Sequence, residues 1–325
     1  MINKKSFNGL STKDWTKNSR SVWNDVSSPR SKNALKHGAT FPKKLSDRII
    51  SIYSTKNDLV LDPFLGTGTT VLSALELKRN AIGFELSEEF YNIALESLKI
   101  HDYNLFDTQN INYNIIKGDC VELIDKLEND SVSLTFTSPP YADLIHKVID
   151  DRKNRHKKSA FVADNNATTR IYSNHEKDLG NMEFETYIKV VKNIMKKLYY
   201  KTKPNGYNIW LVKDYRDTKN KIPYIDLHGN IAQAGIEAGF KYHDLIIWDQ
   251  NERRKLVLLG YPSVFYVNQN HSLYSSLKEN TMTLNLLPNI SSLDTLDIEI
   301  LSKLRQKITK LLIKMVFLVI LEEGA

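Results

Sequence analysis

The residues best suited to chemistry lie in four short loops, and the first of them is rich in glycine. It reads Asp62-Pro-Phe-Leu-Gly-Thr-Gly-Thr-Thr70, in which Gly66 and Gly68 allow a tight turn and the close approach of a ligand. Val71 stands where the dinucleotide fingerprint has its third glycine, and the loop lacks the lysine of a P-loop. These features favour a nucleoside ligand without a phosphate chain, although a plain strand–helix turn would use the same glycines.

The second and third loops each supply one carboxylate after a predicted strand. Glu85 can accept hydrogen bonds from both hydroxyls of a ribose, or it can cap the helix that follows. Asp119, in Gly118-Asp119-Cys120, can hold the exocyclic amine of an adenine, and it can equally cap a helix. The residues alone leave both alternatives open.

The fourth loop, Thr137-Ser138-Pro139-Pro140-Tyr141, combines a hydroxyl, a stiff backbone and an aromatic ring. Two successive prolines remove two N–H donors and fix φ, so the backbone presents its carbonyl groups rigidly. This combination suits a planar base that carries an amino group. A proline-rich strand exit is the alternative, but the position of this motif after three other strand-end loops favours a functional role.

The elements that must position these loops alternate between strands and helices. Apolar runs predict strands at residues 59–61, 81–86, 113–117, 132–136, 207–212, 245–248 and 263–267. Helical patterns lie between them, as expected for an α/β fold with a mostly parallel sheet and helices on both faces. Such sheets bind ligands at the carboxyl ends of their strands, where all four loops fall.

Domain organisation follows from the same patterns. We expect an irregular extension over residues 1–36, one domain over 37–277 with a polar insert at 142–180, and a helical tail over 278–325. The single cysteine, Cys120, excludes a disulfide framework and a cysteine-based zinc cluster, and no metal site is predicted. The longest apolar run, 311–321, is shorter than the roughly 20 residues that span a bilayer, and no signal segment is apparent.

Two of the loops together resemble the paired signatures of the S-adenosylmethionine-dependent DNA amino-methyltransferases. The cofactor loop of that family reads D-P-F-x-G-x-G-T-T, and its catalytic loop reads S, D or N before P-P and then an aromatic residue. The segment from His37 to Pro42 resembles a further cofactor-binding segment, H-P-A-x-F-P, with Gly38 in place of proline. The resemblance covers about residues 36–274 and implies a Rossmann-like methyltransferase fold with a seven-stranded sheet.

The resemblance also implies a cofactor and a reaction. S-adenosylmethionine would donate its methyl group by direct displacement to the exocyclic nitrogen of a flipped base, without a covalent enzyme intermediate. The implied catalytic residues are Ser138, Pro139, Pro140 and Tyr141. The implied cofactor-binding residues are Thr40, Phe41, Asp62, Phe64, Gly66, Gly68, Thr69, Glu85 and Asp119.

Serine before the two prolines is the form usual for transfer to cytosine N4, whereas aspartate is usual for adenine N6. We therefore expect a site-specific cytosine-N4 methyltransferase of a restriction–modification or defence system, with adenine N6 as the alternative. A catalytically inactive DNA-binding protein of the same fold is a second alternative, and an RNA substrate stays open. An oxidoreductase is disfavoured because the glycine loop lacks its third glycine.

The chain carries 45 Lys and Arg against 38 Asp and Glu, a net charge of +7, and part of the excess lies directly after the fourth loop. We expect double-stranded DNA as a partner, with a cognate restriction endonuclease in the same system, in a prokaryotic cytoplasm. A solvated loop is the alternative interpretation of the basic insert. The expected DNA-binding residues are Lys147, Arg152, Lys153, Arg155, Lys157, Lys158, Arg253 and Arg254.

Overall fold

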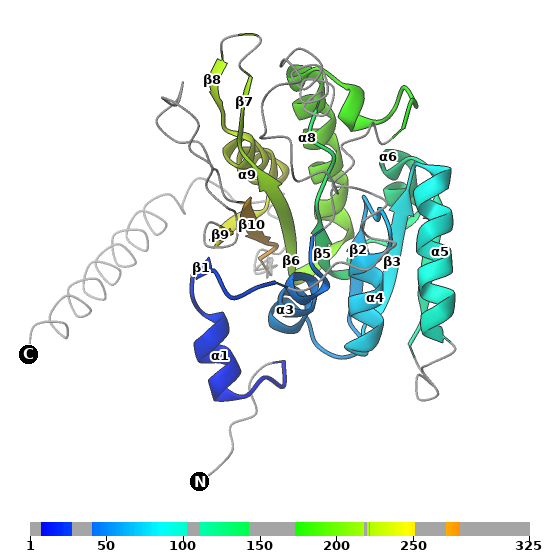
Figure 1. Cartoon of the computed structure of the whole chain (residues 1–325), viewed down its shortest axis with the longest axis vertical. Helices are drawn as coiled ribbons and strands as arrows, with labels where there is room; N and C mark the ends of the chain where they lie inside the picture. Colours follow the sequence, from blue (N-terminus) through cyan, green and yellow to red (C-terminus); the bar gives the residue numbers. More distant parts are fainter. Residues whose placement is uncertain are drawn as a thin grey trace, which may run out of the picture. The chain divides into compact units, whose positions relative to one another are not determined.

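A mostly parallel sheet forms the centre of the computed structural model (Figure 1). Its strand order is β1-β9-β10-β6-β5-β2-β3-β4, and only the pairs made by β10 are antiparallel. The strands are β1 (Val22–Trp23), β2 (Leu59–Asp62), β3 (Asn80–Glu85), β4 (Tyr113–Lys117), β5 (Val132–Thr137), β6 (Thr202–Lys213), β9 (Lys241–Trp248) and β10 (His271–Leu277). The predicted α/β class with a mostly parallel sheet is confirmed.

The structure describes residues 8–27, 41–102, 111–142, 173–217, 220, 222–250 and 271–279. Residues Met1–Asn280 form one compact unit and Thr281–Ala325 a second, and all described residues belong to the first. The strand predicted at 263–267 and most of the predicted tail lie outside the described residues. Within the described ranges, no helix combines the length and apolar character needed to cross a membrane.

Helices cover both faces of the sheet because each central strand sends alternate side chains to opposite sides. In β6, Ile209 and Leu211 pack into one hydrophobic core, whereas Trp210 and Val212 pack into the other. The first core is closed by α3 (Lys43–Tyr53), α4 (Thr69–Glu76) and α5 (Glu88–Asp102). The second is closed by α6 (Cys120–Leu123), the 3₁₀ turn η1 (Ile124–Lys126), α8 (Phe184–Lys201) and α9 (Leu227–Ala238).

Among the described residues the sheet has eight strands instead of the expected seven, because the N-terminal segment contributes one. Residues Thr12–Asn18 form α1, and β1 pairs with β9 in parallel, so the segment expected to be irregular contains a helix and a strand. Trp23 is buried, and the Arg48 guanidinium lies 4.9 Å from the centre of its ring. Arg48 also donates to both carboxylate oxygens of Asp25, at 2.8 and 2.7 Å. These contacts fix the segment against the fold.

A small antiparallel hairpin follows β6 after one intervening residue. It consists of β7 (Tyr215–Asp217) and β8 (Ile222–Ile225), and it leads directly into α9. In Figure 1 the hairpin stands beyond the end of β6, apart from the main sheet.

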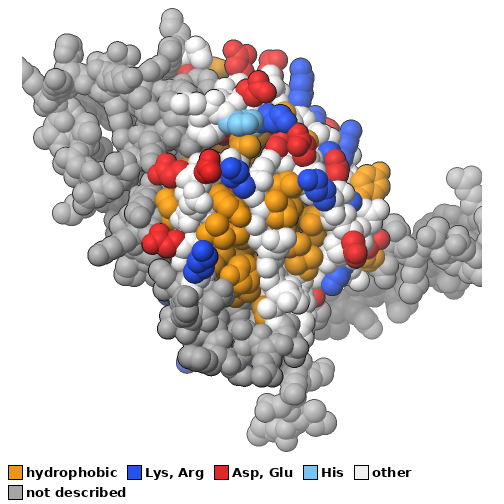
Figure 2. Space-filling view, turned by 90° about the vertical axis from the view of Figure 1, so that its right-hand side faces the viewer, with side chains coloured by type: hydrophobic (Ala, Val, Ile, Leu, Met, Phe, Trp, Pro, Cys, Tyr) orange, Lys and Arg blue, Asp and Glu red, His pale blue; other side chains and the backbone are white. Residues whose placement is uncertain are grey.

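Figure 2 shows the side of the molecule that lies at the right of Figure 1, where α5 is found. Hydrophobic side chains on this face occur in small groups, and the acidic and basic side chains between them are interspersed. The partly buried residues Tyr91 and Leu95 of α5 and Tyr113 of β4 pack against the first core from this side.

Candidate active site

The four predicted loops meet at one cavity at the carboxyl edge of the sheet. Strand β2 pairs in parallel with β3 and with β5, and β3 pairs in parallel with β4. The carboxyl ends of these four strands therefore lie at the same edge of the sheet. All four predicted catalytic residues, Ser138, Pro139, Pro140 and Tyr141, line this cavity. Six of the predicted cofactor-binding residues line it as well: Phe41, Phe64, Gly66, Thr69, Glu85 and Asp119.

Three predicted cofactor-binding residues are not found in the lining. Thr40 lies outside the described residues. Gly68 begins α4 with a φ of 90°, and a Cβ added there would lie 3.3 Å from the Cβ of Ala94, so it serves the packing of α4 on α5. Asp62 is 2% exposed and is not among the residues that line the cavity. For Gly68 and Asp62 the structure therefore shows a role in shaping the loops.

Asp62 connects the first loop to the fourth. Its Oδ1 accepts a hydrogen bond of 2.6 Å from the hydroxyl of Thr137, the residue before Ser138. The same oxygen accepts a hydrogen bond of 3.1 Å from the backbone N–H of Phe64. Burial raises the pKa of Asp62 to about 6, and the hydrogen bond from Thr137 acts in the opposite direction. The glycine loop and the proline loop are thus held together by one buried carboxyl group.

Glu85 is hydrogen-bonded on both carboxylate oxygens and still lines the cavity. Oε2 accepts from the backbone N–H of Gly66 at 2.7 Å, and Oε1 accepts from the N–H of Ser87 at 2.8 Å. Each oxygen of a carboxylate can accept a second hydrogen bond, so capacity for two hydroxyl donors is left after these two bonds. Burial raises the pKa of Glu85 to about 7. The turn before α5 and a ribose can therefore use the same side chain.

Asp119 caps the helix that follows it, which is one of the two roles predicted for this residue. Its Oδ1 accepts from the N–H of Val121 at 2.9 Å, at the start of α6. Oδ2 lies 3.8 Å from the Nζ of Lys177, which is also paired with Glu122 at 2.5 Å. Asp119 lines the cavity together with Lys177, so capping and ligand contact are compatible.

Sequence reasoning missed several residues of the cavity wall. Trp248 ends β9, and Gln250 follows it, so the strand-end rule applies to both. Lys177 lies near the end of the polar insert and is marked by no comparable pattern. Cys120 also lines the cavity, and burial raises the pKa of its thiol far above the ordinary value, which disfavours the reactive thiolate.

The expected DNA-binding residues cannot be placed in this geometry. Residues 143–172 and 251–270 lie outside the described part of the chain. They include the whole predicted set: Lys147, Arg152, Lys153, Arg155, Lys157, Lys158, Arg253 and Arg254.

Comparison with known proteins adds a family match over the N-terminal part of the chain. Residues 2–96 match the family model N6_N4_Mtase, described as DNA methylase. The matched segment contains the Asp62–Thr70 loop and Glu85, whereas Asp119 and the Ser138–Tyr141 loop lie beyond it.

Curated relatives are similar over short segments. The type II methyltransferase M.MjaI of Methanocaldococcus jannaschii is 50% identical over 62 residues, which are 19% of this chain and 20% of that protein. The type II methyltransferase M.MthZI of Methanothermobacter thermautotrophicus is 43% identical over 76 residues, 22% and 21% of the two chains. The chain thus spans about a fifth of the length of these relatives.

Among solved structures, a SAM-dependent methyltransferase from Methanosarcina mazei aligns over 71% of this chain and 97% of its own, with 11% identity and a TM-score of 0.42. That score is too low to add to the fold described above. Over residues 2–96, this chain is similar to DNA methylases.

Proposed function

We propose that this chain is an S-adenosylmethionine-dependent DNA methyltransferase of the restriction–modification type. The match of residues 2–96 to a DNA methylase model and the similarity to type II methyltransferases support this function. The observation that carries the proposal is that Glu85, Asp119 and the Ser138–Tyr141 loop line the same cavity. A nucleoside cofactor and an amino group of a base can be bound side by side there.

The residues of the cavity fit the cofactor. Glu85 would accept the ribose hydroxyls on its remaining lone pairs, and Asp119 would face the adenine amine. Gly66 has a φ of 56° and no side chain, so the backbone of the first loop can approach the methionine end closely. When bound, S-adenosylmethionine supplies an electrophilic methyl group on its sulfonium.

The fourth loop would prepare the acceptor nitrogen. The lone pair of an aromatic amine is delocalised into the ring, so the free amine is a weak nucleophile. Hydrogen bonds from its two N–H groups to the Ser138 hydroxyl and the Pro139 carbonyl favour a tetrahedral nitrogen with an available lone pair. Stacking of the base on Tyr141 would contribute about 1–3 kcal/mol. That offsets part of the few kcal/mol needed to extrude a base from the duplex.

Cytosine N4 is the target that we propose, because serine at position 138 is the form usual for cytosine-N4 enzymes in the family that the loops resemble. Adenine N6 is the alternative target. The partners proposed with this activity are double-stranded DNA and a cognate restriction endonuclease. The catalytically inactive alternative requires loss of the loop chemistry, but Ser138 to Tyr141 are present and line the cavity.

The proposal is tested by methyl transfer from labelled S-adenosylmethionine. The full chain is incubated with duplex DNA of mixed sequence, and in parallel with RNA and with a protein mixture. We expect label in the DNA fraction only. Label in RNA or protein alone, or bound cofactor without transfer to any acceptor, would contradict the proposed function.

A further inference from the structure

The β7–β8 hairpin is rooted next to the proposed catalytic loop. Tyr215 and Ile225, at the two ends of the hairpin, are buried in the same hydrophobic core as Ala142, and Tyr141 packs against that core. Burial raises the pKa of Tyr187 of α8, and the neighbouring hydroxyls of Tyr141 and Tyr215 raise it further, so Tyr187 lies near both the catalytic loop and the hairpin. The hairpin thus rises from the carboxyl edge of the sheet, beside the cavity.

Strand β8 of the hairpin exposes apolar surface. Ile222 is 42% exposed and Tyr224 is 46% exposed, and Pro223 between them is exposed too. Six large hydrophobic residues are exposed in the described part of the chain, and two of them lie on this four-residue strand. Burying such a surface on a partner is favourable, so this concentration points to a contact.

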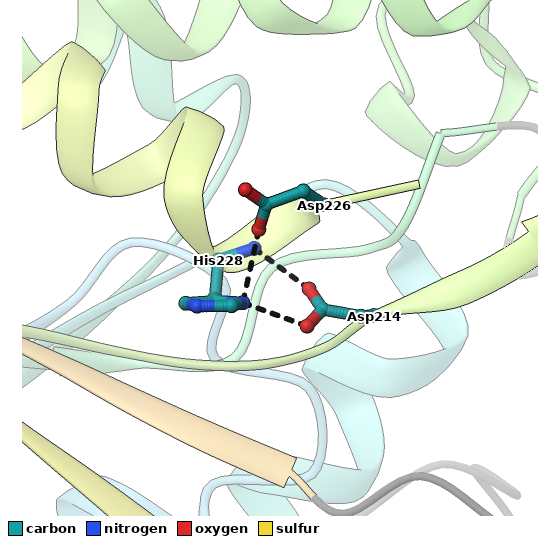
Figure 3. Close-up of side chains that lie close together, drawn as sticks. All are labelled: Asp214, Asp226 and His228. Carbon is teal, nitrogen blue, oxygen red and sulfur yellow. Dashed lines mark hydrogen bonds and ion pairs between the residues drawn. The ribbon is translucent and has the colours of Figure 1, made fainter. Parts of the chain in front are cut away.

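Asp214, Asp226 and His228 form a cluster of polar side chains (Figure 3), and this cluster binds the hydroxyl of Tyr224 through Asp214. Asp214, between β6 and β7, accepts hydrogen bonds from the Tyr224 hydroxyl at 2.5 Å and from the backbone N–H of His228 at 3.0 Å. The Nδ1 of His228 lies 2.7 Å from Asp214 and 3.1 Å from Asp226. Both are hydrogen-bond or ion-pair distances between side chains. We therefore interpret the cluster as a clasp that orients Tyr224.

The hairpin segment also carries basic residues whose charge complements a polyanion. Residues 213–225 contain two acids, and both are engaged within the hairpin. Asp214 belongs to the clasp, and Asp217 is buried and accepts two hydrogen bonds from Asn220, at 3.1 and 2.8 Å. By sequence, the basic residues of the segment are Lys213, Arg216, Lys219 and Lys221; Lys219, Lys221 and the side chain of Arg216 lie outside what the structure describes.

We propose that the β7–β8 hairpin is a DNA-contacting element that packs Ile222 and Tyr224 against the duplex beside the extruded base. The inference rests on the proposed function. Proteins that distort DNA commonly insert apolar side chains between base steps. Extrusion of a base leaves an unstacked position that such side chains can cover.

The test compares hairpin variants with matched variants elsewhere. Ile222→Ala and Tyr224→Ala remove the exposed apolar groups, and Tyr224→Phe keeps the ring but loses the hydroxyl that bonds Asp214. Tyr200→Ala is the control for the tyrosine, because Tyr200 is 63% exposed near the end of α8, at the opposite edge of the sheet. Ile236→Ala on α9, where the side chain is 45% exposed, is the control for the isoleucine.

Dissociation constants for duplex DNA, measured by fluorescence anisotropy, give the readout, with cofactor binding measured by calorimetry. We expect Tyr224→Ala to weaken DNA binding about 10-fold, as removal of one stacking ring does. Ile222→Ala is expected to weaken it less, and cofactor affinity and both controls stay at the wild-type value. Tyr224→Phe is expected to bind DNA within a few-fold of the wild type.

Unchanged DNA affinity in both alanine variants, or equal losses of affinity in the controls, would overturn the hairpin inference. The proposed function would still stand in that case, provided that the wild type methylates DNA. A wild type that neither binds nor methylates DNA would contradict both. The hydrogen bonds of the clasp do not involve Ile222, so Ile222→Ala keeps the test valid if Tyr224→Ala unfolds the hairpin.

Discussion

Replacement of Thr137 by valine removes a hydrogen bond that joins the proline loop to Asp62. Thr137 is fully buried at the end of β5, and its hydroxyl donates to Asp62 Oδ1 at 2.6 Å. Valine has the same shape, so the substitution deletes a donor without opening a cavity. A hydrogen bond to a charged acceptor contributes about 1.5–3 kcal/mol, and we expect the free energy of unfolding to fall by that amount at pH 8.

The loss is expected to depend on pH because the acceptor titrates. The pKa of Asp62 is raised from 3.8 to about 6, so the folded state binds more protons than the unfolded chain between these values. Stability attributable to Asp62 therefore falls as the pH rises through this window. Thr137→Val removes a bond that favours the carboxylate, so its cost is largest above pH 6. Below pH 5 the acceptor is neutral, and the expected loss is about 0.5–1.5 kcal/mol.

Urea unfolding at pH 5 and pH 8, followed by tryptophan fluorescence, measures this difference. Thr135→Val is the matched control, because Thr135 is fully buried on the same strand and its hydroxyl has no hydrogen-bond partner among the described residues. We expect the control to keep or gain stability at both pH values. Equal losses in the two variants, or a Thr137→Val loss that is the same at pH 5 and pH 8, would refute the reasoning.

Three further predictions concern the cavity and the clasp. Because burial raises the pKa of Glu85 to about 7, cofactor affinity measured by calorimetry is expected to rise as the pH increases through 7, and Glu85→Gln to abolish that dependence. Ser138→Ala is expected to keep cofactor binding but to lower turnover by about 10- to 100-fold. This factor corresponds to the free energy that one hydrogen bond to a developing charge contributes to the transition state. Unchanged turnover would exclude the role assigned to Ser138. The hydrogen bond to Asp214 raises the pKa of His228, so the clasp stabilises the fold below pH 6.5. This contribution is lost as the pH rises through the pKa of His228 in the folded state. If the melting temperatures of the wild type and of His228→Ala respond to pH in the same way, the prediction is contradicted.

Most of the candidate site could be predicted from the sequence because its residues directly follow predicted strands. A residue such as Glu85 or Ser138 follows an apolar run, and parallel strands bring their carboxyl ends to one edge whatever the intervening helices are. The convergence of the four loops on one cavity follows from this rule. The alternatives for Glu85 and Asp119 were not separable, because a carboxylate after a strand can bond the next helix and a ligand at once.

Other features depend on contacts that no local pattern records. The last residue of a strand can turn to either side; Asp62 was expected to bind the cofactor, whereas its side chain is buried and is not among the residues that line the cavity. The pairing of Val22 with Ile247 joins distant parts of the chain, and the two-residue strand that results has no periodicity to detect. The β8 strand contains Pro223, which argues against a strand in sequence terms even though it fits an isolated hairpin.

The central claim is that the cavity transfers a methyl group to the amino nitrogen of a DNA base. The most direct measurement digests DNA to nucleosides after incubation with labelled S-adenosylmethionine and identifies the labelled product by chromatography and mass spectrometry. The account predicts N4-methylcytosine. Label on adenine N6 would contradict the proposed target base, and DNA that carries no label at all would contradict the central claim.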